Sequence, residues 1–293
     1  LNKDYDNNQM ACFFQKINGL TNTITISRNR NMIDIFSISS VQREKDRHCT
    51  ESNIQKRLLD LEKSGPSKEL VAVKNDTIEN IINLKKDFPH FSAVIDHIGR
   101  SLLLQALCPK ECTTHSKECT THSKECTTHS KIRIPAPIML YGTPGSGKTR
   151  FVNEVAKILK TPFSNIDCGT TCPKFAFSGT PPTYQNADCS KVVSAIGKHT
   201  IANPIILMDE LDKLSSTNDD AYSSLYALLE GYQAKSFHDH FYNIEFDLSH
   251  VLWFATANQL NNIPDPIISR MDLFEIENPD KNQTLKIVDS IYK

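Results

Sequence analysis

The chain has 293 residues, of which 39% are hydrophobic and 23% are charged, and its formal net charge is -1. This composition supports a packed core and excludes a wholly disordered chain, and the charge balance excludes a protein that coats nucleic acid through general basicity. The apolar runs are far too short to cross a membrane and no charged-then-apolar leader opens the chain, so the sequence predicts a soluble, cytoplasmic protein without membrane contacts.

The first 110 residues carry a mainly helical pattern where one can be read. We expect helices at Asn53–Lys63, at Asp76–Asp87 and at Ser92–Cys108, the last of which is clearly amphipathic. Asp76 is the expected N-cap of the second helix, because Glu79 follows three residues later. The rest of this region is not assigned.

Three identical copies of ECTTHSK follow at residues 111–131. The period of seven suggests a coiled coil, but no apolar residues stand at the a and d positions, so this interpretation fails. Regularly spaced Cys and His are an alternative signal for a soft metal. A surface insertion is favoured, because Thr, Ser and Lys do not build a core.

From Ile134 onward, short apolar runs alternate with helical patterns, beginning with a helix at Lys148–Lys160. Apolar strands separated by helices are typical of a parallel sheet that is covered on both faces, so the sequence predicts an α/β fold of this kind. The expected strands are Ile138–Tyr141, Phe163–Asp167, Ile205–Met208, Val251–Ala255 and Leu273–Ile276.

The segment GTPGSGKT fits the pattern GxxxxGK[ST] and lies between an expected strand and an expected helix. Glycines let backbone N–H groups turn toward phosphate oxygens, and the helix N-terminus adds partial positive charge. Lys148 is expected to reach the β and γ phosphates of ATP, and the Thr149 hydroxyl is expected to bind Mg²⁺. The candidate nucleotide-binding residues are Gly142, Thr143, Pro144, Gly145, Ser146, Gly147, Lys148 and Thr149.

Three further positions are candidates for the hydrolysis of ATP. A buried strand ends in Asp209-Glu210, which places Asp209 near Mg²⁺ as a nucleotide and metal ligand and leaves Glu210 as the general base for the attacking water. Asn258 ends the next strand, so its amide can contact the γ phosphate or orient the water. Arg270 has a guanidinium suited to stabilise transition-state charge in the site of a neighbouring subunit. The candidate catalytic residues are Glu210, Asn258 and Arg270.

The stretches NPIILMDELDKLSS, LYALLEGYQAKSFHDHFYNIEFDLSHVLWFATAN and IPDPIISRMDLFEI resemble the ATPase module of Lon proteases and their AAA+ relatives, over about Ile134 to Ile276. The hallmark is a short β excursion at Phe237–Ser249. The resemblance implies a P-loop AAA+ fold, ATP hydrolysis, a homo-oligomer (a hexamer) and a protein substrate. It also places Tyr184 at the aromatic position of the central-pore loop, which grips polypeptide.

Metal sites are weaker alternatives at two places. Cys168, Cys172 and Cys189 supply only three thiols, and the favoured interpretation is reduced cysteines of a cytosolic protein. His238-Asp239-His240 lacks a further ligand nearby, and in the Lon-like pattern this segment is structural.

We expect five segments. These are an N-terminal region of unknown role, a helical segment, the repeat insertion, the AAA+ nucleotide-binding domain and the start of a helical lid, at residues 1–75, 76–110, 111–131, 132–279 and 280–293. Lon proteases continue into a full lid and a protease domain. The chain is therefore expected to be either a Lon-like ATPase without a protease or a truncated piece of a Lon-type protease.

Three functions remain open, and ATP-driven protein unfolding or remodelling is favoured. A nucleic-acid-directed AAA+ ATPase lacks its expected basic stripe, because residues 111–293 carry 17 Lys and Arg against 21 Asp and Glu. A regulatory module that no longer hydrolyses ATP disagrees with the intact set of candidate catalytic residues.

Overall fold

The computed structural model describes residues 32–48, 53–107, 131–169, 173–214, 219–281 and 283–285. The ECTTHSK copies up to residue 130 and the larger part of the expected lid helix lie outside these residues, as does Cys172. No helix in the described ranges is long and apolar enough to span a bilayer.

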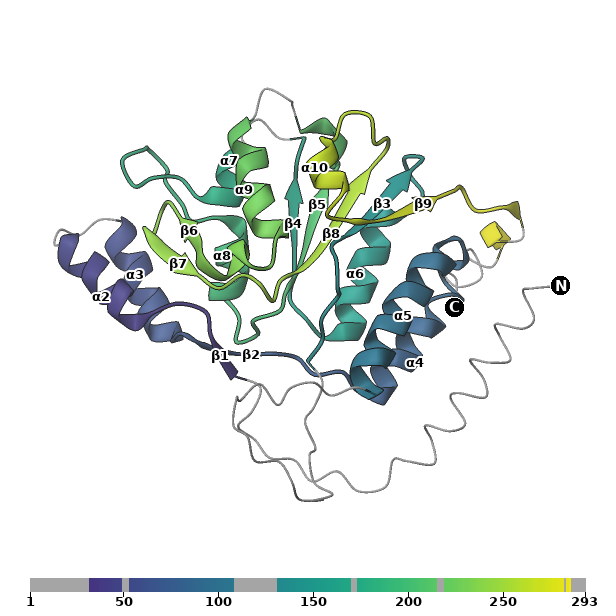
Figure 1. Ribbon diagram of the computed structural model, residues 1–293, viewed down its shortest axis with the longest axis horizontal. Helices are drawn as coiled ribbons and strands as arrows, with labels where there is room; N and C mark the ends of the chain where they lie inside the picture. The colour runs from purple at the N-terminus through teal and green to yellow at the C-terminus, as the bar shows by residue number, and fades with distance from the viewer. Residues whose placement is uncertain are drawn as a thin grey trace, which may run out of the picture. The chain divides into compact units, whose positions relative to one another are not determined.

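A five-stranded parallel sheet forms the centre of the fold (Figure 1). Its strand order is β4-β5-β8-β3-β9, and each neighbouring pair runs parallel. The sheet confirms the predicted α/β P-loop architecture, and every expected strand is found within one or two residues of its predicted bounds. The strands are β3 (Ile138–Gly142), β4 (Phe163–Asp167), β5 (Ile205–Asp209), β8 (Leu252–Ala257) and β9 (Asp272–Ile276).

Helices cover both faces of this sheet because its central strands are apolar on both sides. Helix α6 (Lys148–Leu159) contacts β5 and β8, and α7 (Pro173–Ser178) and α8 (Lys191–Gly197) contact β4. Helix α9 (Asp219–Leu229) packs on α7. All six residues of β8 are buried, which is the pattern that parallel strands need between two helical layers.

The N-terminal part adds two helices, α2 (Ile38–Arg47) and α3 (Asn53–Ser64), and the short antiparallel strands β1 (Met32–Asp34) and β2 (Ser67–Glu69). The helix predicted from Asn53 is confirmed as α3. Helix α2 and the two strands were not predicted, because each strand has three residues and α2 buries only Val41 and Glu44. Buried residues of α2 and α3 belong to the same apolar core as α8 and α9.

Two helices lead from this part toward the sheet, α4 (Asn75–Asn83) and α5 (Ser92–Leu107), joined through the short helix η1 (Pro89–Phe91). The prediction of Asp76 as N-cap is wrong. Lys74 holds the N-cap position with extended backbone angles, so Asp76 lies in the first turn. A carboxylate in that turn still complements the helix dipole.

Hydrogen bonds join the end of α5 to the residues that follow Lys131. Arg133 N donates to the Gln105 side-chain oxygen at 2.9 Å, and the Gln105 amide donates back to the Arg133 carbonyl. Ile132 N also donates to the Val71 carbonyl at 2.9 Å. Both ends of the repeat insertion are therefore attached to the described fold.

The expected β excursion is an antiparallel hairpin of β6 (Phe237–Asp239) and β7 (Ile244–Phe246), preceded by the short helix η3 (Gln233–Ser236). Two other short helices flank strands of the sheet. Helix η2 (Leu211–Lys213) follows β5, and helix α10 (Asp265–Ile268) precedes β9. The five segment boundaries given above remain predictions.

One glycine is required where β3 meets β9. Gly142 has a φ of 139°, and a Cβ on it would collide with the backbone carbonyl of Ile276. Only a residue without a side chain lets the two strands pair closely at the start of the phosphate loop.

Candidate functional site

The phosphate loop of residues 142–147 connects β3 to α6. Gly147 holds the N-cap position of α6 with a left-handed φ of 87°, so the chain turns sharply into the helix. Lys148 is the first residue of the helix, and its side chain folds back into the loop. Its ammonium donates to the carbonyls of Gly142 at 2.9 Å and Thr143 at 2.8 Å. A cation is therefore fixed inside a ring of backbone groups.

Lys148 is buried, which is costly for a charged group. Burial lowers the pKa of its ammonium, and the nearby carboxylates of Asp212 and Asp209 oppose this shift. The ammonium and these acidic side chains thus lie close enough to influence one another.

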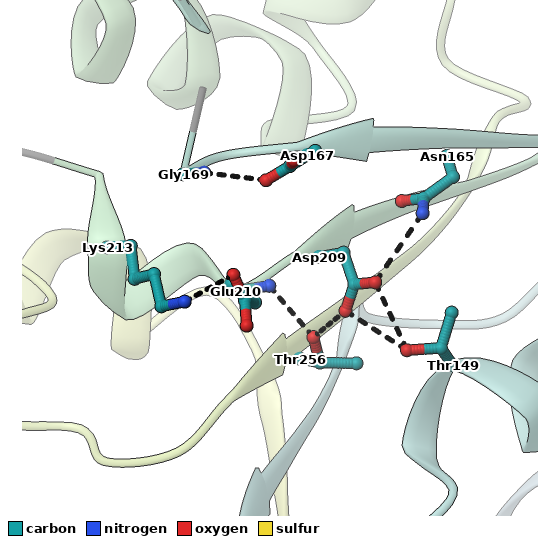
Figure 2. Close-up of polar contacts among 8 residues, drawn as sticks. All are labelled: Thr149, Asn165, Asp167, Gly169, Asp209, Glu210, Lys213 and Thr256. Atoms are coloured by element: carbon teal, nitrogen blue, oxygen red, sulfur yellow. Dashed lines mark hydrogen bonds and ion pairs between the residues drawn. The ribbon is translucent and has the colours of Figure 1, made fainter. Parts of the chain in front are cut away.

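The Asp209 carboxylate is the centre of the polar cluster drawn in Figure 2. Asp209 is the last residue of β5, and its carboxylate accepts hydrogen bonds from the Thr149 hydroxyl at 3.1 Å and from the Thr256 hydroxyl. The Asn165 amide lies 3.5 Å from the same group. Thr149 and Asp209, each predicted as a Mg²⁺ ligand, thus lie in contact, and strands β4, β5 and β8 and the start of α6 contribute residues to the cluster.

Glu210 follows directly with a left-handed backbone, at a φ of 56°. Its N–H donates to the Thr256 hydroxyl at 2.9 Å, and its carboxylate pairs with the Lys213 ammonium at 2.7 Å. Figure 2 shows the Glu210 and Asp209 side chains on either side of Thr256. A left-handed residue after a buried strand turns the chain abruptly, which separates the directions of the two carboxylates.

Asn258 and Arg270 lie at opposite ends of the parallel strands. Asn258 lies at the carboxyl end of β8, and Arg270 lies before the amino end of β9. Asn258 is half-buried and directly follows β8, whose residue Ala257 pairs with Tyr141 beside the phosphate loop. Arg270 instead lies two residues before Asp272, the first residue of β9. Asp272 pairs with Ile138 of β3, and Ile138 lies four residues before Gly142, which corresponds to roughly 13 Å along the strand. Asn258 therefore joins the phosphate edge of its own chain and Arg270 does not.

Arg270 is held by groups at its own edge. Its guanidinium donates to the Pro266 carbonyl at 2.7 Å, lies 3.6 Å from the Glu230 carboxylate and is 5.6 Å from the centre of the Tyr226 ring. About a third of the side chain is exposed. The guanidinium is thus oriented by α9 and remains accessible.

Tyr184 lies outside the phosphate cluster, on the loop between α7 and α8. It is 59% exposed, and its ring centre is 6.1 Å from that of Phe175. Such exposure argues against a core tyrosine and agrees with a contact residue.

Sequence reasoning missed three neighbours of these groups. Thr256 stands in the same Thr-Ala-Asn segment as Asn258, and Lys213 follows Glu210 by one turn, so both had a local signal. His90, on η1, had none. Its ring Nε2 donates to the Ser146 carbonyl of the phosphate loop at 2.9 Å.

The alternative metal sites gain no support from the residues that can be described. Among them, no group of three His, Cys, Asp or Glu side chains is arranged to hold a metal ion. Cys168 and Cys189 are buried free thiols, and burial raises the pKa of each to about 12. The His238 ring lies 3.1 Å from the Asn243 side-chain oxygen, which gives it a partner within the hairpin.

Residues 138–278 match the family described as "ATPase family associated with various cellular activities (AAA)". The chain is similar to the Lon protease of Parabacteroides distasonis, with 31% identity over 226 residues that make up 76% of this chain and 27% of that protein. It is 36% identical to the Lon protease of Porphyromonas gingivalis over 47% of this chain and 17% of that protein. It is 34% identical to the peroxisomal Lon protease homolog 2 of Zea mays over 52% of this chain and 17% of that protein. The chain thus spans about a quarter or less of these relatives.

Replacement of Thr256 by Val should destabilise the fold by about 1–3 kcal/mol, because the partly buried Glu210 N–H and the Asp209 carboxylate each lose a hydrogen-bond partner. The free energy of unfolding from urea titration measures this change. Thr161→Val is the matched control, since Thr161 is also buried and its hydroxyl has no hydrogen-bond partner among the described residues. Equal losses in the two variants would contradict the role assigned to the Thr256 hydroxyl.

Proposed function

Residues 138–278 form a Lon-like ATPase domain of the AAA family, and on that premise we propose that the chain binds ATP with Mg²⁺ and hydrolyses it at the cluster around Asp209. The observation that carries the proposal is the 3.1 Å contact between the Thr149 hydroxyl and the Asp209 carboxylate. Thr149 directly follows Lys148, so this contact lies beside the phosphate loop. Hydroxyl and carboxylate oxygens are ligands that Mg²⁺ accepts, and this cation commonly takes only one or two of them from protein, together with phosphate oxygens.

The phosphate loop and α6 would bind the phosphates. The Lys148 ammonium neutralises charge on the β and γ phosphates, and the N-terminus of α6 adds partial positive charge. The residues of the loop other than Pro144 would contribute backbone N–H groups. Thr149 and Asp209 would hold Mg²⁺, which when bound neutralises negative charge on the phosphate oxygens.

Glu210 is the proposed general base and Asn258 the residue that contacts the γ phosphate or orients the water. The Glu210 carboxylate accepts a proton from water as the water attacks phosphorus. Its ion pair with Lys213 holds the carboxylate in a fixed direction. Asn258 stands at the same sheet edge and carries an uncharged amide, which can donate to an oxygen without competing for the proton.

Lys148→Ala should abolish ATP binding, whereas Glu210→Gln should keep the affinity within about threefold and reduce turnover by about 100-fold or more. Lys148 acts on the bound phosphates, but Glu210 acts only on the attacking water. Binding of a fluorescent ATP analogue and steady-state phosphate release give the two quantities. Equal loss of affinity in both variants would refute these roles.

We further propose that Arg270 acts on the ATP of a neighbouring copy in a homo-oligomer, a hexamer by resemblance to Lon. Arg270 precedes Asp272, whose pairing partner in β3 lies four residues, roughly 13 Å, before Gly142, and this placement away from the phosphate loop of its own chain supports a role at the site of a neighbouring copy. The packing of its guanidinium against Tyr226 holds it ready at that edge.

Arg270→Ala should bind ATP normally and lose about 1,000-fold or more in turnover, the range expected for an arginine finger. Turnover per subunit of the unaltered chain should rise with protein concentration. Mixing Arg270→Ala with Glu210→Gln should restore part of the activity, at contacts that pair an intact Glu210 with an intact Arg270. Arg100→Ala is a suitable control because Arg100 is also exposed. Full activity in a monomer would disprove the trans role.

The work done by hydrolysis is proposed to be the unfolding or remodelling of protein substrates. The support is Tyr184, an exposed aromatic ring on the loop between α7 and α8, apart from the phosphate loop. An exposed ring can grip an extended polypeptide by apolar contact without reading its sequence. A nucleic-acid substrate is disfavoured by the net negative charge of residues 111–293.

Tyr184→Ala should leave basal ATP turnover nearly unchanged and remove its acceleration by an unfolded casein, whereas Tyr184→Phe should keep most of it. ATP turnover with casein and with single- or double-stranded DNA provides the comparison. Stimulation by DNA alone would favour the nucleic-acid alternative. A lower melting temperature of Tyr184→Ala would instead show that the ring is needed for folding.

A further inference from the structure

The base of the loop that carries Tyr184 is tied to a helix from the N-terminal part of the chain. We call residues 187–190 the loop stem. The Asn53 amide at the start of α3 donates to the Ala187 carbonyl at 3.2 Å, and the Arg57 guanidinium pairs with the Asp188 carboxylate at 2.9 Å. Two polar side chains one helical turn apart thus hold consecutive residues of the stem.

The hairpin β6–β7 holds the stem from a second direction. Asp239 is fully buried, and its carboxylate accepts from the Ser190 N–H at 2.8 Å. The same carboxylate lies so close to Gly179, at the other end of the loop, that a Cβ there would be 3.0 Å from it. Inside the loop, Thr180 N donates to the Asp188 carbonyl at 2.9 Å. Both ends of the loop therefore lie against Asp239 of the hairpin. Asp188 is the residue of the loop stem that pairs with Arg57 of α3.

The helix pair α2–α3 is itself fastened to that hairpin. The Asn243 amide in the hairpin turn donates to the buried Glu44 carboxylate of α2 at 3.2 Å. Asp247 N donates to the Ile35 carbonyl at 2.8 Å, and the rings of Phe36 and Phe246 meet edge to face with centres 5.7 Å apart. The helix pair is thus a fixed support from which Arg57 can act.

The two polar contacts, Asn53 with Ala187 and Arg57 with Asp188, are not needed to hold α3 in the core. Leu58 of α3 belongs to the same apolar core as Ala187 and Cys189 of the stem, so α3 and the stem share a core without the polar contacts. Arg57 and Asp188 are 34% and 57% exposed, and an ion pair of such exposure adds little to global stability. Its effect is local, because it fixes a residue four positions from Tyr184.

We propose that α2–α3 is a brace for the Tyr184 loop and that Arg57 is a positioning residue, which through Asp188 holds Tyr184 in place to contact polypeptide. The proposal rests on the proposed function of Tyr184. Its distinctive consequence is that a residue remote from the phosphate loop controls the response to polypeptide and leaves basal ATP turnover alone.

The test compares Arg57→Ala with the unaltered full-length chain in two measurements. Hydrogen exchange of the backbone amides of residues 180–188 should become about two- to fivefold faster, the range set by the strength of an exposed ion pair. The concentration of unfolded casein that gives half-maximal stimulation of ATP turnover should rise by a similar factor, with basal turnover unchanged. The charge swap of Arg57→Asp with Asp188→Arg should restore both values, which a purely space-filling role of Arg57 would not predict.

Lys45→Ala is the matched control. The Lys45 ammonium pairs with the Glu62 carboxylate at 2.7 Å, so this change removes an ion pair between α2 and α3 without touching the loop stem. Both measurements should stay at the values of the unaltered chain.

Unchanged exchange in Arg57→Ala would overturn the brace, and faster exchange with unchanged casein response would overturn the positioning role. If casein does not stimulate even the unaltered chain, the proposed remodelling function fails, and with it the role of Arg57 in polypeptide contact. Exchange would still show in that case whether α3 holds the loop, so the two failures are distinguishable.

Discussion

Parallel pairing of β3, β5 and β8 brings the carboxyl ends of these strands to one edge of the sheet, and the polar cluster exists only at that edge. Leu207 pairs with Phe254 and Ile138 with the same Phe254, so Leu207 and Ile138 lie level on either side of β8. A slip of one residue would turn Asp209 away from Thr149 and bury a carboxylate among apolar side chains. The pairing of the apolar strands thus fixes the positions of the charged groups at their ends.

The cluster is also an electrostatic compromise. Two consecutive acids, Asp209 and Glu210, end one strand, and like charges so close together would repel each other. Each has a different partner: hydroxyl groups of Thr149 and Thr256 surround Asp209, whereas the Lys213 ammonium neutralises Glu210. The left-handed backbone at Glu210 makes this separation possible, at a conformational cost of about 1 kcal/mol or more.

Local patterns were sufficient to predict the sheet and the phosphate loop. Buried parallel strands are uniformly apolar, and the spacing of Gly142, Gly147 and Lys148 is short, so both signals lie within a few residues. The contact of Lys213 with Glu210 was missed although it is local, whereas that of His90 with Ser146 was missed because it joins distant parts of the chain. Helix α2 was missed because polar contacts such as that of Glu44 with Asn243 fasten it, and these leave no apolar period in the sequence. The error at Asp76 had a different cause. The sequence around Asp76 has a good local N-cap pattern, but the helix begins earlier and Lys74 is its N-cap.

The pinned ends of the repeat insertion have a consequence for how this gene can change. Gln105 and Arg133 bond to each other in both directions, so the two points that the insertion connects stay together whatever lies between them. The entropic cost of joining two fixed points grows only with the logarithm of the number of residues, about 0.6 kcal/mol for each doubling. Adding or removing one copy of ECTTHSK is therefore expected to change the stability of the described fold by well under about 1 kcal/mol.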